Sequence, residues 1–408
     1  MRRFSSAMAL SVFLSAAPVT DTAVRFEPKP RAVSTGRDPV LHVRASGAVS
    51  LLKVDAGNLY LETSNDAGDS FDEKVRVNST EGEVSSHGES SPRLAIRNRG
   101  EFYVLWQARK EGGESSELHF ARSTGWGESF TKSISVDPTS PSQNFFNLAL
   151  SPQGVVYATW LDGRDRGKGK QGSSAVYLAR STNKGVSFEP AVRVSLDSCP
   201  CCRPWISFSG ENNVHVGWRR VLEENVRDIF ISTSTDGGKT FAAGVRVAED
   251  NWKINGCPHS GPAMANIGNR LYASWATVRD EKAQLYLAWS DDQGKTFTKR
   301  ASLADGVLDP NHPYLMNAGG KVAIVFQGRQ QKQNEGWGPV NAWYREVDAA
   351  GALSPLQRIG NFGASVSYPV IAYEDPGRVF VAWTETVDEK RSVVLARGRR
   401  VKGTPNAR

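Results

Sequence analysis

Short alternating strands run through the whole chain. Five segments place an apolar residue at every second position and end just before a serine: LYLET, LHFAR, VYLAR, IFIST and LYLAW. Apolar–polar alternation over four to eight residues is typical of a β-strand with one buried face. The segments between them carry no helical period, so the pattern predicts an all-β protein.

Each of these strands leads into the same eight-residue phrase, which is built on Ser, Gly and Phe. The phrases begin at Ser64, Ser123, Ser181, Ser234 and Ser290, at intervals of 53 to 59 residues. Their Gly and Asp or Asn residues favour a tight turn into a following strand. Each phrase is therefore predicted to be the turn of a β-hairpin.

Two further strands precede each hairpin. The nearer one closes on an aromatic residue, at Trp106, Trp160, Trp218, Trp275, Phe326 and Trp383. The farther one opens at Pro39, Pro92, Pro204, Pro262, Pro313 or Pro369, with Phe146 in the equivalent place of the remaining unit. These openings recur about every 55 residues. The period predicts a single β-propeller, with seven four-stranded blades favoured and six as the alternative.

The last unit ends after the strand SVVLAR and lacks a fourth strand. At the other end of the chain, AVRF at Ala23 to Phe26 resembles KVRV, AVRV and GVRV, the fourth strands of three other units. We expect this segment to pair with SVVLAR and close the ring, which would remove an exposed sheet edge.

The phrase Ser-x-Asp-x-Gly-x-Thr-Phe resembles the Asp box of the sialidase-like, or BNR-repeat, superfamily. The resemblance covers nearly the whole chain after the first residues and implies a propeller whose boxes lie on the face away from the active site. Two copies have Gly125 and Asn183 in place of the Asp, as expected of structural turns. Sialidases have six blades, so a count of seven departs from their pattern.

The first residues have the layout of an export signal. A basic start, MRR, precedes an apolar stretch over residues 7–14 and small residues at 15–17. This stretch is too short to span a bilayer and is typical of a secretory signal peptide. We expect residues 1–22 to be removed, residues 23–400 to form the propeller and residues 401–408 to be a basic tail, in a periplasmic or secreted protein.

Charge and hydropathy restrict the kinds of partner that the sequence predicts. The net charge of +7 comes from basic residues that are scattered along the chain, whereas a nucleic-acid-binding protein clusters them. No later segment approaches the roughly 20 apolar residues of a membrane helix. We therefore expect neither a nucleic-acid partner nor a membrane span.

The four cysteines occupy two related hexapeptides, CPCCRP at 199–204 and CPHSGP at 257–262. Cys199 and Cys257 both lie five residues before the Pro that opens a strand, as His87 does; Cys201, His259 and Glu89 lie three residues before it. In a propeller these loops surround the channel mouth. The candidate metal ligands are Cys199, Cys201, Cys202, Cys257, His259 and His312. Thiolate and imidazole suit Zn²⁺ or Cu(I), and two disulfides are the alternative in an oxidising compartment.

Arginines are predicted to surround the same mouth, because they follow the second strand of a unit or precede the first. They are Arg37, Arg109, Arg164, Arg203, Arg219, Arg279 and Arg329. Such a ring would attract a carboxylate, sulfate or phosphate group, including one carried by a glycan.

Sialidases use an arginine in a Phe/Tyr-Arg-Ile-Pro motif, an acid Asp, and a Tyr nucleophile with a Glu partner. The resemblance assigns these roles to Arg37, Asp55, Tyr368, and Glu211 or Glu385, but the motif here is Gly-Arg-Asp-Pro. Three hypotheses follow, in this order: a protein that binds a metal ion or an anionic ligand at the mouth, an exo-α-sialidase-type glycoside hydrolase, and a scaffold that docks a protein partner and carries disulfide staples.

Overall fold

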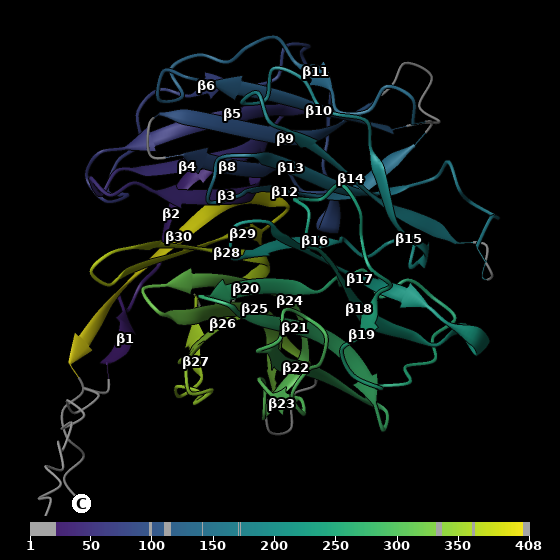
Figure 1. Ribbon diagram of the computed structural model, residues 1–408. Helices are drawn as coiled ribbons and strands as arrows, with labels where there is room; N and C mark the ends of the chain where they lie inside the picture. The colour runs from purple at the N-terminus through teal and green to yellow at the C-terminus, as the bar shows by residue number, and fades with distance from the viewer. Residues whose placement is uncertain are drawn as a thin grey trace, which may run out of the picture.

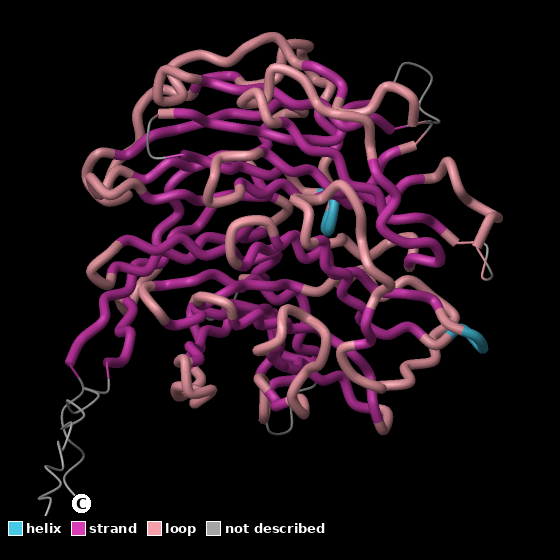
Figure 2. The backbone as a smooth tube through the Cα atoms, viewed as in Figure 1, coloured by secondary structure: helices cyan, strands magenta, loops and turns pink. Residues whose placement is uncertain are grey.

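The computed structural model describes residues 22–97, 100–109, 116–140, 142–169, 171, 173–331, 337–360 and 364–402. Strands dominate these residues, and Figure 2 shows two short helical turns among them, η1 (Gly88–Ser90) and η2 (Glu223–Asn225). The expectation of an all-β chain is therefore confirmed. The predicted signal segment falls outside the described residues, apart from Thr22, and so do residues 403–408 of the predicted tail. Within the described residues no helix is long and apolar enough to cross a membrane.

The strands follow one another as antiparallel meanders (Figure 1). The first comprises β3 (Arg37–Val43), β4 (Val49–Asp55), β5 (Asn58–Ser64) and β6 (Val75–Arg76). The second comprises β7 (Val84–Ser85), β8 (Arg93–Arg97), β9 (Glu101–Arg109), β10 (Ser116–Ser123) and β11 (Ile134–Ser135). The third comprises β12 (Gln143–Leu150), β13 (Val156–Asp162), β14 (Ser174–Ser181) and β15 (Val192–Ser198).

The pattern continues to the end of the chain. β16 (Trp205–Ser209), β17 (Asn213–Val221), β18 (Arg227–Ser234) and β19 (Val245–Arg246) join the preceding meander through one pair, Ser198 with Arg220. Then come β20 (Ala263–Ile267), β21 (Arg270–Arg279), β22 (Lys282–Ser290) and β23 (Ala301–Ser302). β24 (Val307–Ala318), β25 (Lys321–Gln331), β26 (Trp337–Val347) and β27 (Gln357–Ile359) follow. The last are β28 (Ser365–Glu374), β29 (Arg378–Val387) and β30 (Lys390–Lys402).

The first long strands of the successive meanders contact one another in order. β3 contacts β8, which contacts β12, and the series continues through β16, β20 and β24 to β28, which contacts β3 again. The loops that precede these strands therefore meet around a common centre.

The core lies between neighbouring sheets. The repeated Trp of five meanders lies inside a long strand, two to four residues before its end, and is fully buried, at positions 106, 160, 218, 275 and 383. Trp106 packs with Val54 and Leu61 of the preceding meander, and Trp160 packs with Leu118 in the same way. Truncating a buried Trp to Ala costs about 3–5 kcal/mol, so these side chains hold the sheets together.

The repeated serine phrase folds into one kind of turn. In all five copies the backbone N–H of its Gly donates to the Oγ of its Ser, at 2.7 to 3.2 Å. Each of these glycines has a φ between +75° and +89°, which is the left-handed region where a side chain is strained. The shared residues are therefore explained by turn geometry.

The N-terminal strands complete the last sheet in a way that differs from expectation. β1 (Thr22–Phe26) pairs with β30, but against residues 398–402. The SVVLAR residues pair instead with β2 (Arg31–Thr35), Arg31 opposite Leu395 and Thr35 opposite Ser392. The predicted pairing of Ala23–Phe26 with SVVLAR is thus wrong in register, because period-two alternation does not specify which of two similar segments pairs where.

Candidate functional site

Three residues that directly precede a strand-opening proline have left-handed backbones: Asp38 (φ 55°), His312 (φ 51°) and Tyr368 (φ 50°). At each, the register between the first and second strand shifts as in a β-bulge. Bulges re-aim side chains. All three side chains line one small cavity at the centre, together with Arg93 and Arg203.

Glu89 is the buried hub of this centre. Its Oε2 accepts hydrogen bonds from the backbone N–H groups of Arg203 (3.2 Å) and Gly261 (3.1 Å), and its Oε1 lies 2.9 Å from His312 Nδ1. Burial opposes ionisation, but the Arg203 charge and the His312 and Gly261 hydrogen bonds outweigh it and lower the pKa of Glu89 to about 2. One carboxylate thus links segments of four meanders.

Tyr368 packs on the hub through His312, with ring centroids 4.3 Å apart. Burial, together with the Glu89 charge, raises the pKa of the Tyr368 phenol above its usual range. A Cβ on Gly88 would lie 2.6 Å from the Tyr368 hydroxyl, so the glycine at this position admits the ring.

Two buried arginines line the cavity with unused donors. Arg93 and Arg203 are each 6% exposed. Among the residues that the structure describes, the Nε and Nη2 of Arg93 and the Nε of Arg203 have no hydrogen-bond partner, although Arg203 lies over the Trp205 ring at 5.2 Å. Buried donors are nearly always paired, so these point to a binding role.

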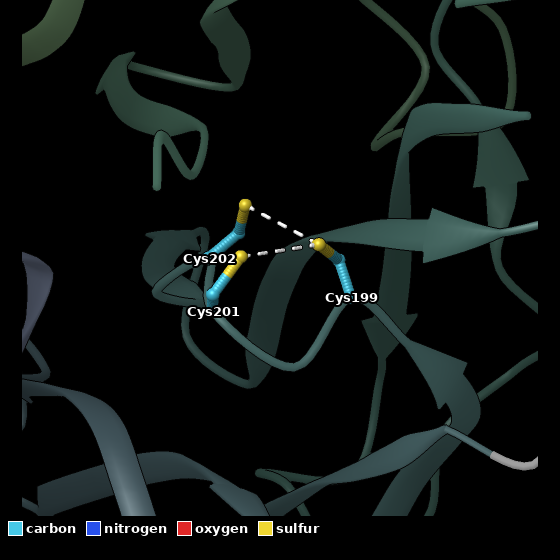
Figure 3. A group of neighbouring side chains, drawn as sticks. All are labelled: Cys199, Cys201 and Cys202. Carbon is cyan, nitrogen blue, oxygen red and sulfur yellow. Dashed lines mark hydrogen bonds between the residues drawn. The ribbon is translucent and has the colours of Figure 1, made fainter. Parts of the chain in front are cut away.

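The loop between β15 and β16 gathers three thiols (Figure 3). Cys199 Sγ lies 3.6 Å from the Sγ of Cys201 and 3.6 Å from that of Cys202. All three side chains are buried and all four cysteines are free thiols, since a disulfide needs about 2.0 Å between sulfurs. Arg227 Nη1 lies 3.2 Å from Cys199 Sγ.

A second group adjoins the first. Ligand atoms of Cys201, Cys257 and His259 lie within 4.8 Å of one another, as do those of Cys199, Cys201 and Cys202. Cys257 and His259 are exposed, whereas Cys201 is 3% exposed. The two hexapeptides therefore meet at Cys201.

Neighbouring thiols and guanidinium groups set the acidity of the cluster. Hydrogen bonds from Cys201 and Cys202, aided by the charges of Arg219 and Arg227, lower the pKa of Cys199 well below its usual range. The bond to Cys199 raises the pKa of Cys201, and burial raises that of Cys202.

The predicted arginine ring is only partly present at the mouth. Strands extend past their tryptophans, so Arg109 and Arg279 end strands and Arg219 and Arg329 lie within them. Arg219 is fully buried and donates to the carbonyls of Ser260, Arg227 and Ala276. Arg219 was expected to face the open channel mouth, but these contacts bury it.

Other predicted arginines are paired. Arg164 bonds Asp137 and Asp162, and Arg37 bonds Asp38 and the Ser86 carbonyl. Of the predicted arginines described here, Arg203 alone lines the small central cavity.

The residues assigned by the sialidase resemblance do not share one site. Tyr368 lines the central cavity, Asp55 faces Lys74 at 3.5 Å, and Glu385 Oε2 accepts a 3.5 Å bond from the Trp383 indole. Glu211 lies in the β16–β17 turn, where the carbonyl of its neighbour Asn212 binds Gly237 of a serine phrase. It is therefore on the side of those turns, away from the mouth.

His312 was expected to be a metal ligand, but it binds Glu89 and packs against the Tyr368 ring, and neither thiol group includes it. Two residues of these sites, Arg93 at the central cavity and Arg227 beside Cys199, were not predicted. Arg93 follows Pro92 and Arg227 opens β18, so the sequence around each indicates only an ordinary strand. Glu89 lies three residues before a proline, as Cys201 and His259 do, and this shared position is the feature of the sequence that could have identified Glu89 as a site residue.

No family model and no curated protein matches the sequence. Solved structures do match. A protein of unknown function from Dyadobacter fermentans aligns with TM-score 0.55 and 14% identity over 92% of this chain and all of its own. A PL25 ulvan lyase bound to -[GlcA(1-4)Rha3S]- gives 0.57 and 11%, over 90% and 95% of the two chains. An α-L-arabinanase from Penicillium chrysogenum in complex with arabinobiose gives 0.52 and 10%, over 90% and 98%.

The chain has a β-propeller-type fold. It shares this fold with polysaccharide lyases and glycoside hydrolases. Because the sequence identities are only 10–14%, the similarity shows the fold and no shared function.

Proposed function

We propose that the protein is an exported, seven-bladed, sialidase-like propeller that binds a thiophilic metal ion, Zn²⁺ or Cu(I), at the mouth of its channel. The order of contacts between β3 and β28 supports the ring of seven, and the serine-phrase turns support the superfamily. The metal role rests on the thiol group.

The spacing of the three buried sulfurs carries the proposal. A metal–thiolate bond of about 2.3 Å gives about 3.8 Å between two sulfurs of a tetrahedral site. The distances from Cys199 to Cys201 and Cys202 are 3.6 Å, so the thiols need little movement to bind one ion. Arg227, 3.2 Å from Cys199, offsets thiolate charge that burial would otherwise disfavour.

Elemental analysis combined with a thiol count tests this role. Protein purified from the periplasm or medium should carry at least one Zn or Cu per chain, and chelation and unfolding without reductant should release four titratable thiols. Cys199→Ser should lower the metal content, whereas His119→Ala, in β10, should not. Absence of metal together with no free thiol would overturn the proposal and leave the cysteines as disulfide staples.

A second function, binding of a small oxyanion in the central cavity, is favoured by donors of Arg93 and Arg203 that have no partner within the described part of the chain. Guanidinium groups bind carboxylate and sulfate through paired hydrogen bonds. Calorimetric titration with formate and with inorganic sulfate tests it. Arg93→Met should abolish the binding and exposed Arg391→Met should not; no heat with either probe would remove this candidate.

Hydrolysis of sialosides is the weaker alternative, since Arg37 is paired with Asp38 and Glu385 accepts a bond from the Trp383 indole. We expect little or no release of sialic acid from an aryl sialoside. Robust turnover that disappears in Arg37→Ala and in Tyr368→Phe would restore this alternative. A docking scaffold is the third alternative, and pull-down of a partner by metal-free protein would favour it.

A further inference from the structure

The two ligand groups at the mouth have one member in common. Cys201 belongs to both, while Cys199 and Cys202 belong only to the buried group and Cys257 and His259 only to the exposed one. The described residues thus form two groups of three and no single group of five. Ligands of one tetrahedral ion lie about 3.3–3.8 Å apart, so one ion does not fit all five donors.

We propose that the mouth holds two metal ions bridged by the Cys201 thiolate. This inference rests on the proposed metal-binding function and deepens it. The inner ion is bound by Cys199, Cys201 and Cys202, and the outer ion by Cys201, Cys257 and His259.

Donor number and charge favour Cu(I) over Zn²⁺. Each ion has three soft or borderline donors, whereas structural Zn²⁺ is almost always four-coordinate and soft thiolates suit Cu(I). Four thiolates and two Cu(I) ions leave two negative charges, which the buried guanidinium groups of Arg219 and Arg227 balance. Two Zn²⁺ ions would instead neutralise the four thiolates and remove the negative charge that faces the two guanidinium groups.

The two ions differ in access. The inner donors are buried, so we expect the inner ion to exchange slowly. The outer ion lies beside a groove of about 280 Å³, which Pro258 and Ser260 line on either side of His259. The outer ion should therefore exchange faster and is open to a further ligand.

Anaerobic Cu(I) loading of the reduced full-length protein, with bicinchoninate as competitor, tests the inference. Wild type should retain two Cu(I) per chain. Cys257→Ser and His259→Ala should each retain one, because only the outer group is broken. Cys201→Ser should lose both at competitor concentrations that leave wild type loaded, and far-UV circular dichroism should show that it is folded.

Other stoichiometries distinguish failure of the two-ion bridge from failure of the proposed metal function. If wild type binds one ion and Cys257→Ser still binds it, the bridge is overturned but the proposed metal function stands. If wild type retains neither Cu(I) nor Zn²⁺, both the bridge and the metal function are overturned. Loss of a single ion in Cys201→Ser would mean two independent sites. If Cys201→Ser does not fold, X-ray absorption of loaded wild type decides, since a shared thiolate requires a short Cu–Cu distance. Tighter retention of two Zn²⁺ than of two Cu(I) would overturn the choice of metal.

Discussion

Replacing Glu89 by Gln removes one charge at the centre of the molecule without changing the size of the side chain. The carboxylate accepts bonds from the Arg203 and Gly261 backbones and from His312. A Gln amide offers one acceptor oxygen and turns an NH₂ group towards partners that are themselves donors. We expect Glu89→Gln to destabilise the fold at neutral pH.

The magnitude follows from the pKa of Glu89, which is about 2 in the fold against an ordinary value of 4.5. At about 1.36 kcal/mol per pKa unit, the difference corresponds to about 3 kcal/mol of stability. Because the folded pKa is depressed, this contribution is complete above about pH 4.5 and is lost as the pH falls from there towards 2. The Gln variant has no such dependence.

Urea unfolding followed by tryptophan fluorescence at pH 7, 5, 4 and 3.5 measures the effect. The difference between wild type and Glu89→Gln should be about 3 kcal/mol at pH 7 and should shrink below about pH 4.5. Glu81→Gln, at a side chain that is 82% exposed, should stay within about 0.5 kcal/mol of wild type. A difference below 1 kcal/mol at pH 7, or one that is constant down to pH 3.5, would contradict the role of Glu89 as an ionised hub.

Two further predictions concern the turns and the N-terminal strand. Gly238→Ala, at φ +83°, should lower the free energy of unfolding by about 1–2 kcal/mol, whereas Gly125→Ala, in open space in an equivalent turn, should have little effect by thermal unfolding. An unchanged Gly238→Ala would mean that the turn tolerates a side chain. Deleting residues 22–26 should expose the paired edge of β30 and cause aggregation in light scattering, while Arg25→Ala keeps the backbone pairing and should remain dispersed. A dispersed deletion variant would show that β1 does not protect this edge.

Most strands could be predicted because their chemistry repeats. Trp106 and Trp160 lie in alternating strands and both are buried between sheets, so local pattern and tertiary packing agree. The register of the N-terminal strands could not be predicted, since AVRF and RAVST both alternate and either could pair with SVVLAR.

The candidate site was predictable where it depends on chain position. Equal offsets before a proline bring Cys201 close to Cys257 and His259. Side-chain direction was not predictable. His312 turns to Glu89 at a bulge with φ 51°, and Arg219 is buried because β17 continues to Val221. Bulges and strand ends depend on neighbouring sheets, which the local sequence does not contain.

Contacts that do not involve sulfur hold the two cysteine hexapeptides together. Gly261 donates to Glu89, the Ser260 carbonyl accepts two bonds from Arg219, and a Cβ on Gly261 would lie 2.0 Å from the Arg203 carbonyl. These contacts therefore bring the two hexapeptides together without any thiol. Small apolar residues would fill the buried positions as well as cysteine does, but packing gives no reason for sulfur at exposed Cys257. Its presence beside Cys201 therefore favours a chemical role for the cluster over a purely structural one.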